Sequence, residues 1–233
     1  MKRQNKILIL TILALSVLCI SCSDLKRDTS APTSSVSENY SPYNCNSCHG
    51  NVTNAAPPKD LEGNTSISES EVSTHQSHLL ASDSVGAAVA CNECHIVPKL
   101  ASDTGHLDLI AGAELTFQGD VVSSNLSALA GSARPAYSQA TLKCDNTYCH
   151  GYFPNGNKVS PTWTDESGQY RACGSCHGDV TKTASGDRAL PKTSLTGGFH
   201  PNNTNCSQCH SRTINASYQV NASLHINGRI DFN

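Results

Sequence analysis

Five short segments of this chain each combine two cysteines with a histidine that directly follows the second one. Their cysteines are Cys45, Cys48, Cys91, Cys94, Cys144, Cys149, Cys173, Cys176, Cys206 and Cys209, and their histidines are His49, His95, His150, His177 and His210. In a Cys-x-x-Cys-His site the two thiols form thioethers with the vinyl groups of one haem, and the histidine is the proximal ligand of its iron. Positions i, i+3 and i+4 share one face of a helical turn, so all three side chains reach the same porphyrin. Covalent haem attachment is therefore expected at all five segments.

The segment Cys144–His150 differs from the other four because four residues, rather than two, separate its cysteines. The two extra residues must bulge outward, while the second cysteine and the histidine stay adjacent. A single Cys-x-x-Cys pair could instead be a redox dithiol or half of a zinc knuckle. Five copies that each continue with histidine favour haem, and they use ten of the twelve cysteines. Few cysteines are left for a disulfide framework.

Five further histidines lie outside these motifs, which matches the number of irons. They are His75, His78, His106, His200 and His225. Methionine is the main competing sixth ligand, but the only methionine is Met1. We therefore predict that each of five c-type haems has two axial histidines, which lower the reduction potential relative to His/Met ligation and leave no open position on the iron. No catalytic residue and no enzymatic activity are expected.

The composition leaves little material for a hydrophobic core. Of 233 residues, 37% are hydrophobic and only 5% are aromatic, and five haems would supply the missing apolar bulk. We expect a mostly irregular fold, with a few short helices and short strands, wrapped around a chain of haems. The net charge of −3 becomes −6 without residues 1–21, which hold three basic residues and no acidic one. Nucleic acid is not an expected partner on this balance.

The N-terminus has the features of an export signal. Three basic residues precede the apolar run Ile7–Ile20, which predicts a signal peptide at 1–21. The residues that follow resemble a bacterial lipobox, which implies lipidation of Cys22, and Ser23 favours an outer-membrane lipoprotein on the periplasmic face or the cell surface. In the alternative, a secreted precursor, Cys22 stays a thiol or is removed. Residues 22–43 are rich in Ser, Thr, Pro and charge and are expected to form a flexible tether.

The remaining chain shows an internal repeat with the order haem site, histidine, haem site, histidine, short alternating tail. We expect a dihaem unit at 44–119, a Ser/Ala/Gly-rich linker at 120–140 and a trihaem unit at 141–233. The two tails, Glu114–Phe117 and Arg229–Phe232, alternate apolar and polar residues and are candidate strands.

Counting histidines in the two units predicts a ligand that crosses between them. The first unit has two haem sites but three spare histidines, whereas the second has three sites and two spare histidines. Aligning His75-Gln-Ser-His78 with His200-Pro-Asn-Asn203 leaves His78 without a counterpart. We predict that His78 ligates the iron at Cys144–His150 and that His75 lies on the same helical face.

Cys144–His150 with Gly151, then Trp163, then Cys173–His177 with Gly178, resembles the tandem C-x4-C-H/C-x2-C-H multihaem cytochromes of metal-reducing, Geobacter-type bacteria. The resemblance implies electron transfer from the respiratory chain towards metal oxides or other acceptors. It also implies that the partners are other c-type cytochromes or porin–cytochrome components of the outer membrane, where the lipid anchor would hold the protein. The first unit lacks a C-x4-C-H site, so the chain has five sites where two full repeats would hold six.

Two other functions are alternatives to electron transfer. A multihaem reductase of a small oxyanion such as nitrite needs an iron with an open position, and the histidine count leaves none. The chain also lacks a Cys-x-x-Cys-Lys site of the kind such reductases often carry. A subunit of an extracellular cytochrome filament is the second alternative, although a lipid-anchored N-terminus argues against it. Trp163 is expected to pack on a haem face or in the small core rather than to relay electrons.

Overall fold

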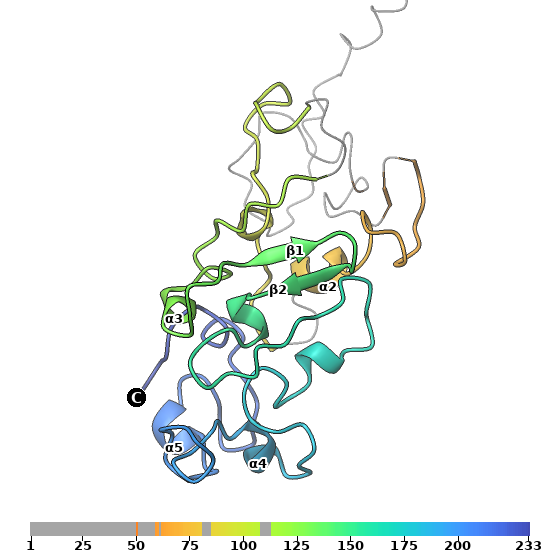
Figure 1. The fold of residues 1–233 in the computed structure, drawn as a ribbon. Helices are drawn as coiled ribbons and strands as arrows, with labels where there is room; N and C mark the ends of the chain where they lie inside the picture. Colours follow the sequence, from red (N-terminus) through yellow and green to blue (C-terminus); the bar gives the residue numbers. More distant parts are fainter. Residues whose placement is uncertain (1–49, 51–58, 61, 81–84, 108–112) are drawn as a thin grey trace, which may run out of the picture. The chain divides into compact units, whose positions relative to one another are not determined.

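The computed structural model describes residues 50, 59–60, 62–80, 85–107 and 113–233. The predicted signal peptide, the lipidation site at Cys22 and the attachment site of Cys45, Cys48 and His49 lie outside the described residues. Regular elements are few and short (Figure 1). They are α2 (His75–Leu79), η2 (Cys91–Glu93), α3 (Asn125–Ala128), β1 (Ala136–Ser138), β2 (Lys143–Asp145), η3 (Tyr148–His150), η4 (Gln169–Arg171), α4 (Ser185–Ala189) and α5 (Ser207–His210). The prediction of a mostly irregular fold with short helices and strands is confirmed.

Helical turns occur at three of the four described attachment sites. They are η2, η3 and α5, and each brings its second cysteine and histidine together as the spacing requires. The site Cys173–His177 forms a turn without a helix. Gly174 has φ +89° there, and an added Cβ would lie 2.6 Å from the carbonyl oxygen of Arg188. Glycine is therefore required at this position, and its left-handed backbone interrupts the helical turn.

The long site begins in a strand and ends in a helical turn. β1 and β2 pair antiparallel with Tyr137 opposite Cys144 (Figure 1), and the Cys144 N–H donates to the Pro161 carbonyl at 3.1 Å on the other side. Asn146 has φ +57°, a conformation that Asn adopts more readily than most residues. It turns the chain from β2 into η3, which absorbs the additional length of this motif.

The tails predicted as strands are not strands, so this prediction was wrong. Glu114–Phe117 and Arg229–Phe232 instead run beside the attachment sites. The Thr116 N–H donates to the Cys94 carbonyl at 2.8 Å, and the Asn233 N–H bonds at 3.1 Å to the carbonyl of the second cysteine in the last site. Leu115 forms a single antiparallel bridge with His95, but the helical turn before His95 offers no further extended partner, so the pairing does not grow into a strand. The alternating pattern correctly predicted extended chain but not its partner.

The buried apolar core of the described residues is small. Its members are Val72, Leu79, Phe117, Val122, Tyr148, Tyr152 and Ala189. Several large apolar side chains are exposed instead, and two of them adjoin histidines of the predicted sites. Phe199, which precedes His200, is 93% exposed, and Phe232, whose ring centre lies 5.0 Å from that of His210, is 62% exposed. Apolar surface beside these histidines is what a haem face would cover.

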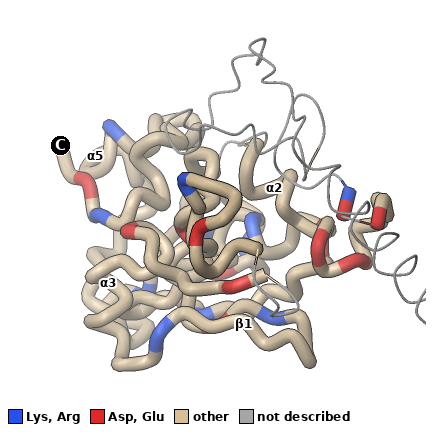
Figure 2. The backbone as a smooth tube through the Cα atoms, turned by 90° about the horizontal axis from the view of Figure 1, so that it is seen from above, with Lys and Arg blue, Asp and Glu red and all other residues tan. Residues whose placement is uncertain are grey.

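Charged residues of both signs are interspersed along the described chain, with no run of basic residues there (Figure 2). In the described part of the chain, no helix combines the length and the apolar character that crossing a membrane requires.

Candidate functional site

Four of the five predicted distal histidines face a proximal histidine. The pairs, with the distances between ring centres, are His75–His95 (6.2 Å), His78–His150 (6.3 Å), His177–His225 (6.2 Å) and His200–His210 (6.4 Å). A metal–nitrogen bond of about 2 Å, with roughly 1.1 Å from nitrogen to ring centre, places two imidazoles on opposite sides of one metal with centres about 6.2–6.4 Å apart. The ring separations therefore fit one iron between each pair, and the cysteines of each motif lie next to its proximal histidine.

The hydrogen bonds of these rings leave the correct nitrogen for iron. Eight described histidines direct Nδ1 at a backbone carbonyl, which can only accept, so Nδ1 carries the proton and Nε2 keeps its lone pair. The histidines and acceptors are His75 with Val72, His78 with Thr74, His95 with Glu114, His106 with Ala101, His177 with Ala189, His200 with Pro201, His210 with Asp231 and His225 with Val85. The ninth, His150, has no such bond, and its Nδ1 is buried.

Burial keeps several of these histidines in the neutral form, which is the form that binds a metal. Burial lowers the pKa of His75, His150 and His177 to about 4. Burial is also the main cause that raises the pKa of Cys149 and of Cys94 to about 12. The thiols of Cys149 and Cys94 are therefore protonated at neutral pH, and all eight described motif cysteines are free of disulfides.

Helix α2 supplies one histidine to each of two sites. His75 and His78 are three residues apart on this helix, so their rings point from one face, as predicted. His75 faces His95 of its own unit, whereas His78 faces His150 across the predicted linker. The structure thus brings together the crossed pair that the histidine count predicts.

Trp163 packs against both histidines of α2. Its ring centre lies 4.8 Å from that of His75, edge to face, and 5.4 Å from that of His78. The indole N–H donates to the Ser70 carbonyl at 2.7 Å, and the Thr74 hydroxyl donates back to the Trp163 carbonyl at 2.9 Å. Trp163 therefore fixes the orientation of two imidazoles that belong to different sites, a role that the sequence did not indicate.

Neighbouring sites lie close to one another along the described chain. The thiol of Cys94 lies near enough to Cys144 for the two to interact electrostatically. The thiol of Cys176 lies 3.2 Å from the carbonyl oxygen of Cys149. His177 in turn interacts with His210 of the last site. The four described sites therefore follow one another in the order of the chain, each next to the one before it.

Asn157 joins the long site to the site that follows it. Its side-chain amide donates to the carbonyls of Gly174 and Ser175, both at 3.0 Å, and to that of Gly178 at 3.3 Å. Its backbone N–H donates to the Cys176 carbonyl at 2.9 Å. One asparagine thus hydrogen-bonds four backbone carbonyls of the turn that carries His177. Nothing in its sequence context distinguishes it from the many other asparagines in the loops.

The segment predicted as a linker contains α3 and β1 and takes part in the sites. Glu93, inside the motif of the second site, accepts hydrogen bonds from the N–H groups of Val121 (3.1 Å) and Val122 (2.8 Å). The Val122 carbonyl accepts in turn from the Tyr148 N–H at 3.2 Å. The attachment sites at His95 and His150 are therefore connected through this segment as well as through α2.

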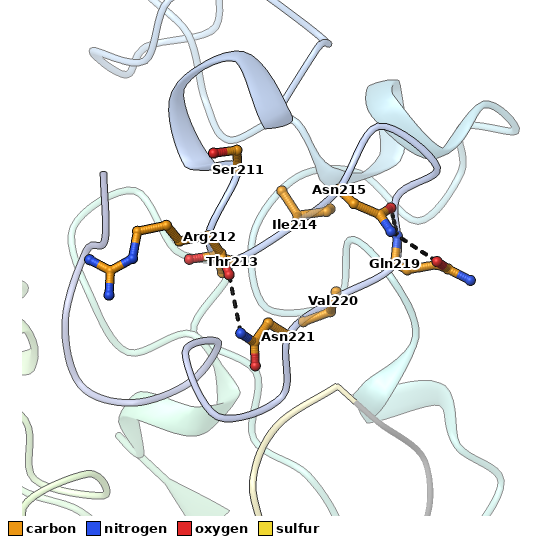
Figure 3. Close-up of a pocket in the computed structure, with 8 residues that line it drawn as sticks. All are labelled: Ser211, Arg212, Thr213, Ile214, Asn215, Gln219, Val220 and Asn221. Carbon is orange, nitrogen blue, oxygen red and sulfur yellow. Dashed lines mark hydrogen bonds between the residues drawn. The ribbon is translucent and has the colours of Figure 1, made fainter. Parts of the chain in front are cut away.

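A pocket of about 280 Å³ lies after the last attachment site (Figure 3). Its lining residues are Ser211, Arg212, Thr213, Ile214, Asn215, Gln219, Val220 and Asn221. The Asn215 and Asn221 amides are engaged in hydrogen bonds within the loop, to Gln219 and to the Arg212 carbonyl. The pocket includes none of the paired histidines or motif cysteines, and we assign it no role in the haem sites. Among the described residues, no group of three or more metal-ligating side chains gathers around one point.

Comparison with known proteins supports the interpretation of the long site. The family model of the Geobacter CxxxxCH...CXXCH motif matches residues 143–177. This stretch covers Cys144–His150 and Cys173–His177, and the match indicates c-type haem binding of the kind found in multihaem cytochromes that transport electrons. No curated protein and no solved structure matches the chain.

Proposed function

We propose that this protein transfers electrons through five covalently bound haems, each with two axial histidines. Four of the ligand pairs are those with ring centres 6.2–6.4 Å apart, and this common separation is the observation that carries the proposal. His106 is the remaining ligand for the fifth iron, at the site of His49, which lies outside the described residues. Haem supplies a one-electron couple at each site. The two histidines leave no coordination position on an iron for a substrate, and the chain places each haem site next to the following one.

The order of the sites supports electron passage from one end of the array to the other. Trp163 and α2 hold the sites of His95 and His150 side by side, and Asn157 holds the sites of His150 and His177. Two histidines per iron leave no position for an oxyanion to bind, so we propose no reductase activity. The physiological role we propose is respiratory electron transfer to metal oxides or other external acceptors.

The paired rings predict two kinds of electron paramagnetic resonance signal from the oxidised protein. The imidazole planes are 22° apart in the pairs His75–His95 and His200–His210, but 65° apart in His78–His150 and 73° in His177–His225. Near-parallel ligand planes split the iron dxz and dyz orbitals, whereas near-perpendicular planes leave them almost degenerate. The first two sites should give rhombic low-spin signals, and the other two should give highly anisotropic low-spin signals. A high-spin signal of one haem or more would contradict closed bis-histidine sites and favour a reductase.

For location, we propose an exported lipoprotein of the outer membrane, anchored through Cys22 and facing either the periplasm or the cell surface. A Cys22→Ala variant should leave the membrane fraction or accumulate as unprocessed precursor, because the thiol that would carry the lipid is missing. Fractionation of cells that express both forms measures this. A Ser21→Ala variant, which keeps a small residue before the cysteine, is the control and should still fractionate with membranes. If Cys22→Ala matures and stays with the membrane, a partner protein and not a lipid holds it there.

A further inference from the structure

The proximal ligand of the long site differs from the other ligands in one respect. Nδ1 of His150 is buried and has no hydrogen-bond partner among the described residues, whereas the other eight described histidines donate Nδ1–H to a carbonyl. At the comparable sites of the repeat, the tail that follows the motif provides this carbonyl, from Glu114 to His95 and from Asp231 to His210 (2.6 Å).

The sequence after the long site explains why no carbonyl reaches His150. The segment 151–163 returns to the backbone of the site itself. The Val159 N–H donates to the His150 carbonyl at 3.0 Å, and the Pro161 carbonyl accepts from the Cys144 N–H at 3.1 Å. These two bonds align the segment with the backbone of the motif, and the buried Nδ1 of His150 receives no carbonyl from it among the described residues.

A hydrogen bond from Nδ1–H makes an imidazole more basic and a stronger electron donor, which stabilises ferric iron and lowers the reduction potential. We infer that His150, lacking this bond, is the weakest donor among the four described proximal ligands, so that its site has the highest reduction potential of the four. The inference rests on the proposed pairing of His150 with His78. Its functional consequence is an electron reservoir inside the array, filled first on reduction and emptied last.

Two features around the long site also affect its reduction potential relative to those of the other sites. Cys173 and Cys209 of the two sites that follow are exposed, whereas both cysteines of the long site are partly buried, as are Cys91 and Cys94 of the site before it. Lower solvent exposure disfavours the more highly charged ferric state, so it acts in the same direction. The nearby Glu93 carboxylate acts in the opposite direction, but it influences Cys94 as well as Cys149. Its charge is also compensated by the N–H groups of Val121 and Val122.

The test is a redox titration of the haem-loaded wild-type protein, with paramagnetic resonance spectra recorded at each potential. Among the four described sites, one highly anisotropic signal should disappear first as the potential is lowered. A His78→Met variant assigns it, since methionine changes the ligation of this site alone and should remove that same signal. His75→Met, three residues earlier on α2, is the matched control and should remove a rhombic signal. A His106→Met variant marks the signal of the fifth site, so that it can be set aside.

The outcomes separate this inference from the proposed function. If a rhombic signal, or the anisotropic signal that His78→Met leaves unchanged, disappears first in the wild-type protein, His150 does not set the highest potential and the inference fails alone. If His78→Met removes no anisotropic signal, the pairing itself is wrong, and both the inference and the proposed ligation fail. Because the wild-type titration needs no variant, loss of both rhombic signals before either anisotropic one overturns the inference by itself.

Discussion

Replacing His78 by alanine should open one iron, and the opened iron should be the one attached at Cys144–His150. The His78 ring faces His150 at 6.3 Å, and its loss leaves a methyl group that cannot ligate. The reduced variant should bind carbon monoxide at one haem, whereas the reduced wild-type protein should bind none. In the oxidised variant, one highly anisotropic resonance signal should be replaced by a five-coordinate, high-spin signal.

His75→Ala is the matched control for this experiment, since it removes the same side chain from the same helix. His75 faces His95, so this variant should also bind carbon monoxide at one haem but should lose a rhombic signal instead. If His78→Ala loses a rhombic signal, or opens no iron, the ligand does not cross between the two units. The sites of His95 and His150 would then be able to separate without breaking an iron–nitrogen bond.

Gly178→Ala should strongly destabilise the site of His177. Gly178 has φ +91°, and an added Cβ would lie 2.1 Å from the Arg188 carbonyl oxygen. Relief of this clash requires the 188–189 segment to move, which breaks the hydrogen bonds from Asp179 N–H to Arg188 and from His177 Nδ1 to Ala189, both 2.9 Å. Each bond contributes about 1 kcal/mol, and the left-handed backbone costs a non-glycine residue roughly 1–2 kcal/mol more. We expect the free energy of unfolding to fall by about 3–4 kcal/mol.

Gly197→Ala separates the clash from the backbone strain. Gly197 has nearly the same φ, +89°, but an added Cβ meets nothing within 4 Å, so only the cost of roughly 1–2 kcal/mol for the backbone should appear. Denaturant unfolding of both haem-loaded variants, followed through the visible absorption of the bis-histidine haems, measures the difference. Equal destabilisation by the two substitutions would show that the contact between Gly178 and Arg188 has no role in holding His177.

The sequence could predict the sites because their chemistry depends on side chains at regular spacings. The Cys-x-x-Cys-His pattern locates the cysteines and proximal histidines, the histidine count predicts that one ligand crosses to the long site, and the alignment of the two units selects His78. The lipidation of Cys22 and the site of His49 remain predictions, since both lie outside the described residues. Which histidine faces which motif otherwise depends on how irregular loops fold, and no periodic pattern encodes that.

The supporting interactions could not be predicted, for a physical reason. All eight acceptors of the histidine Nδ1 groups are backbone carbonyls, which every residue has, so Glu114 and Asp231 carry no distinguishing signal. Asn157 and Glu93 act through contacts with segments 17 to 29 residues away, which local sequence does not reveal. The tails failed as strands for a related reason. Alternation predicts an extended chain, but a strand also needs an extended partner, and these tails lie against helical turns.

Mass spectrometry of the mature protein under denaturing conditions tests the central claim most directly. Thioether bonds survive denaturation and acid–acetone extraction, whereas haem bound only by iron ligation is lost. The predicted result is a polypeptide that carries five haem masses. A mature protein without covalent haem would contradict the account, and four masses would contradict the count and leave Cys144–His150 as the first site to examine.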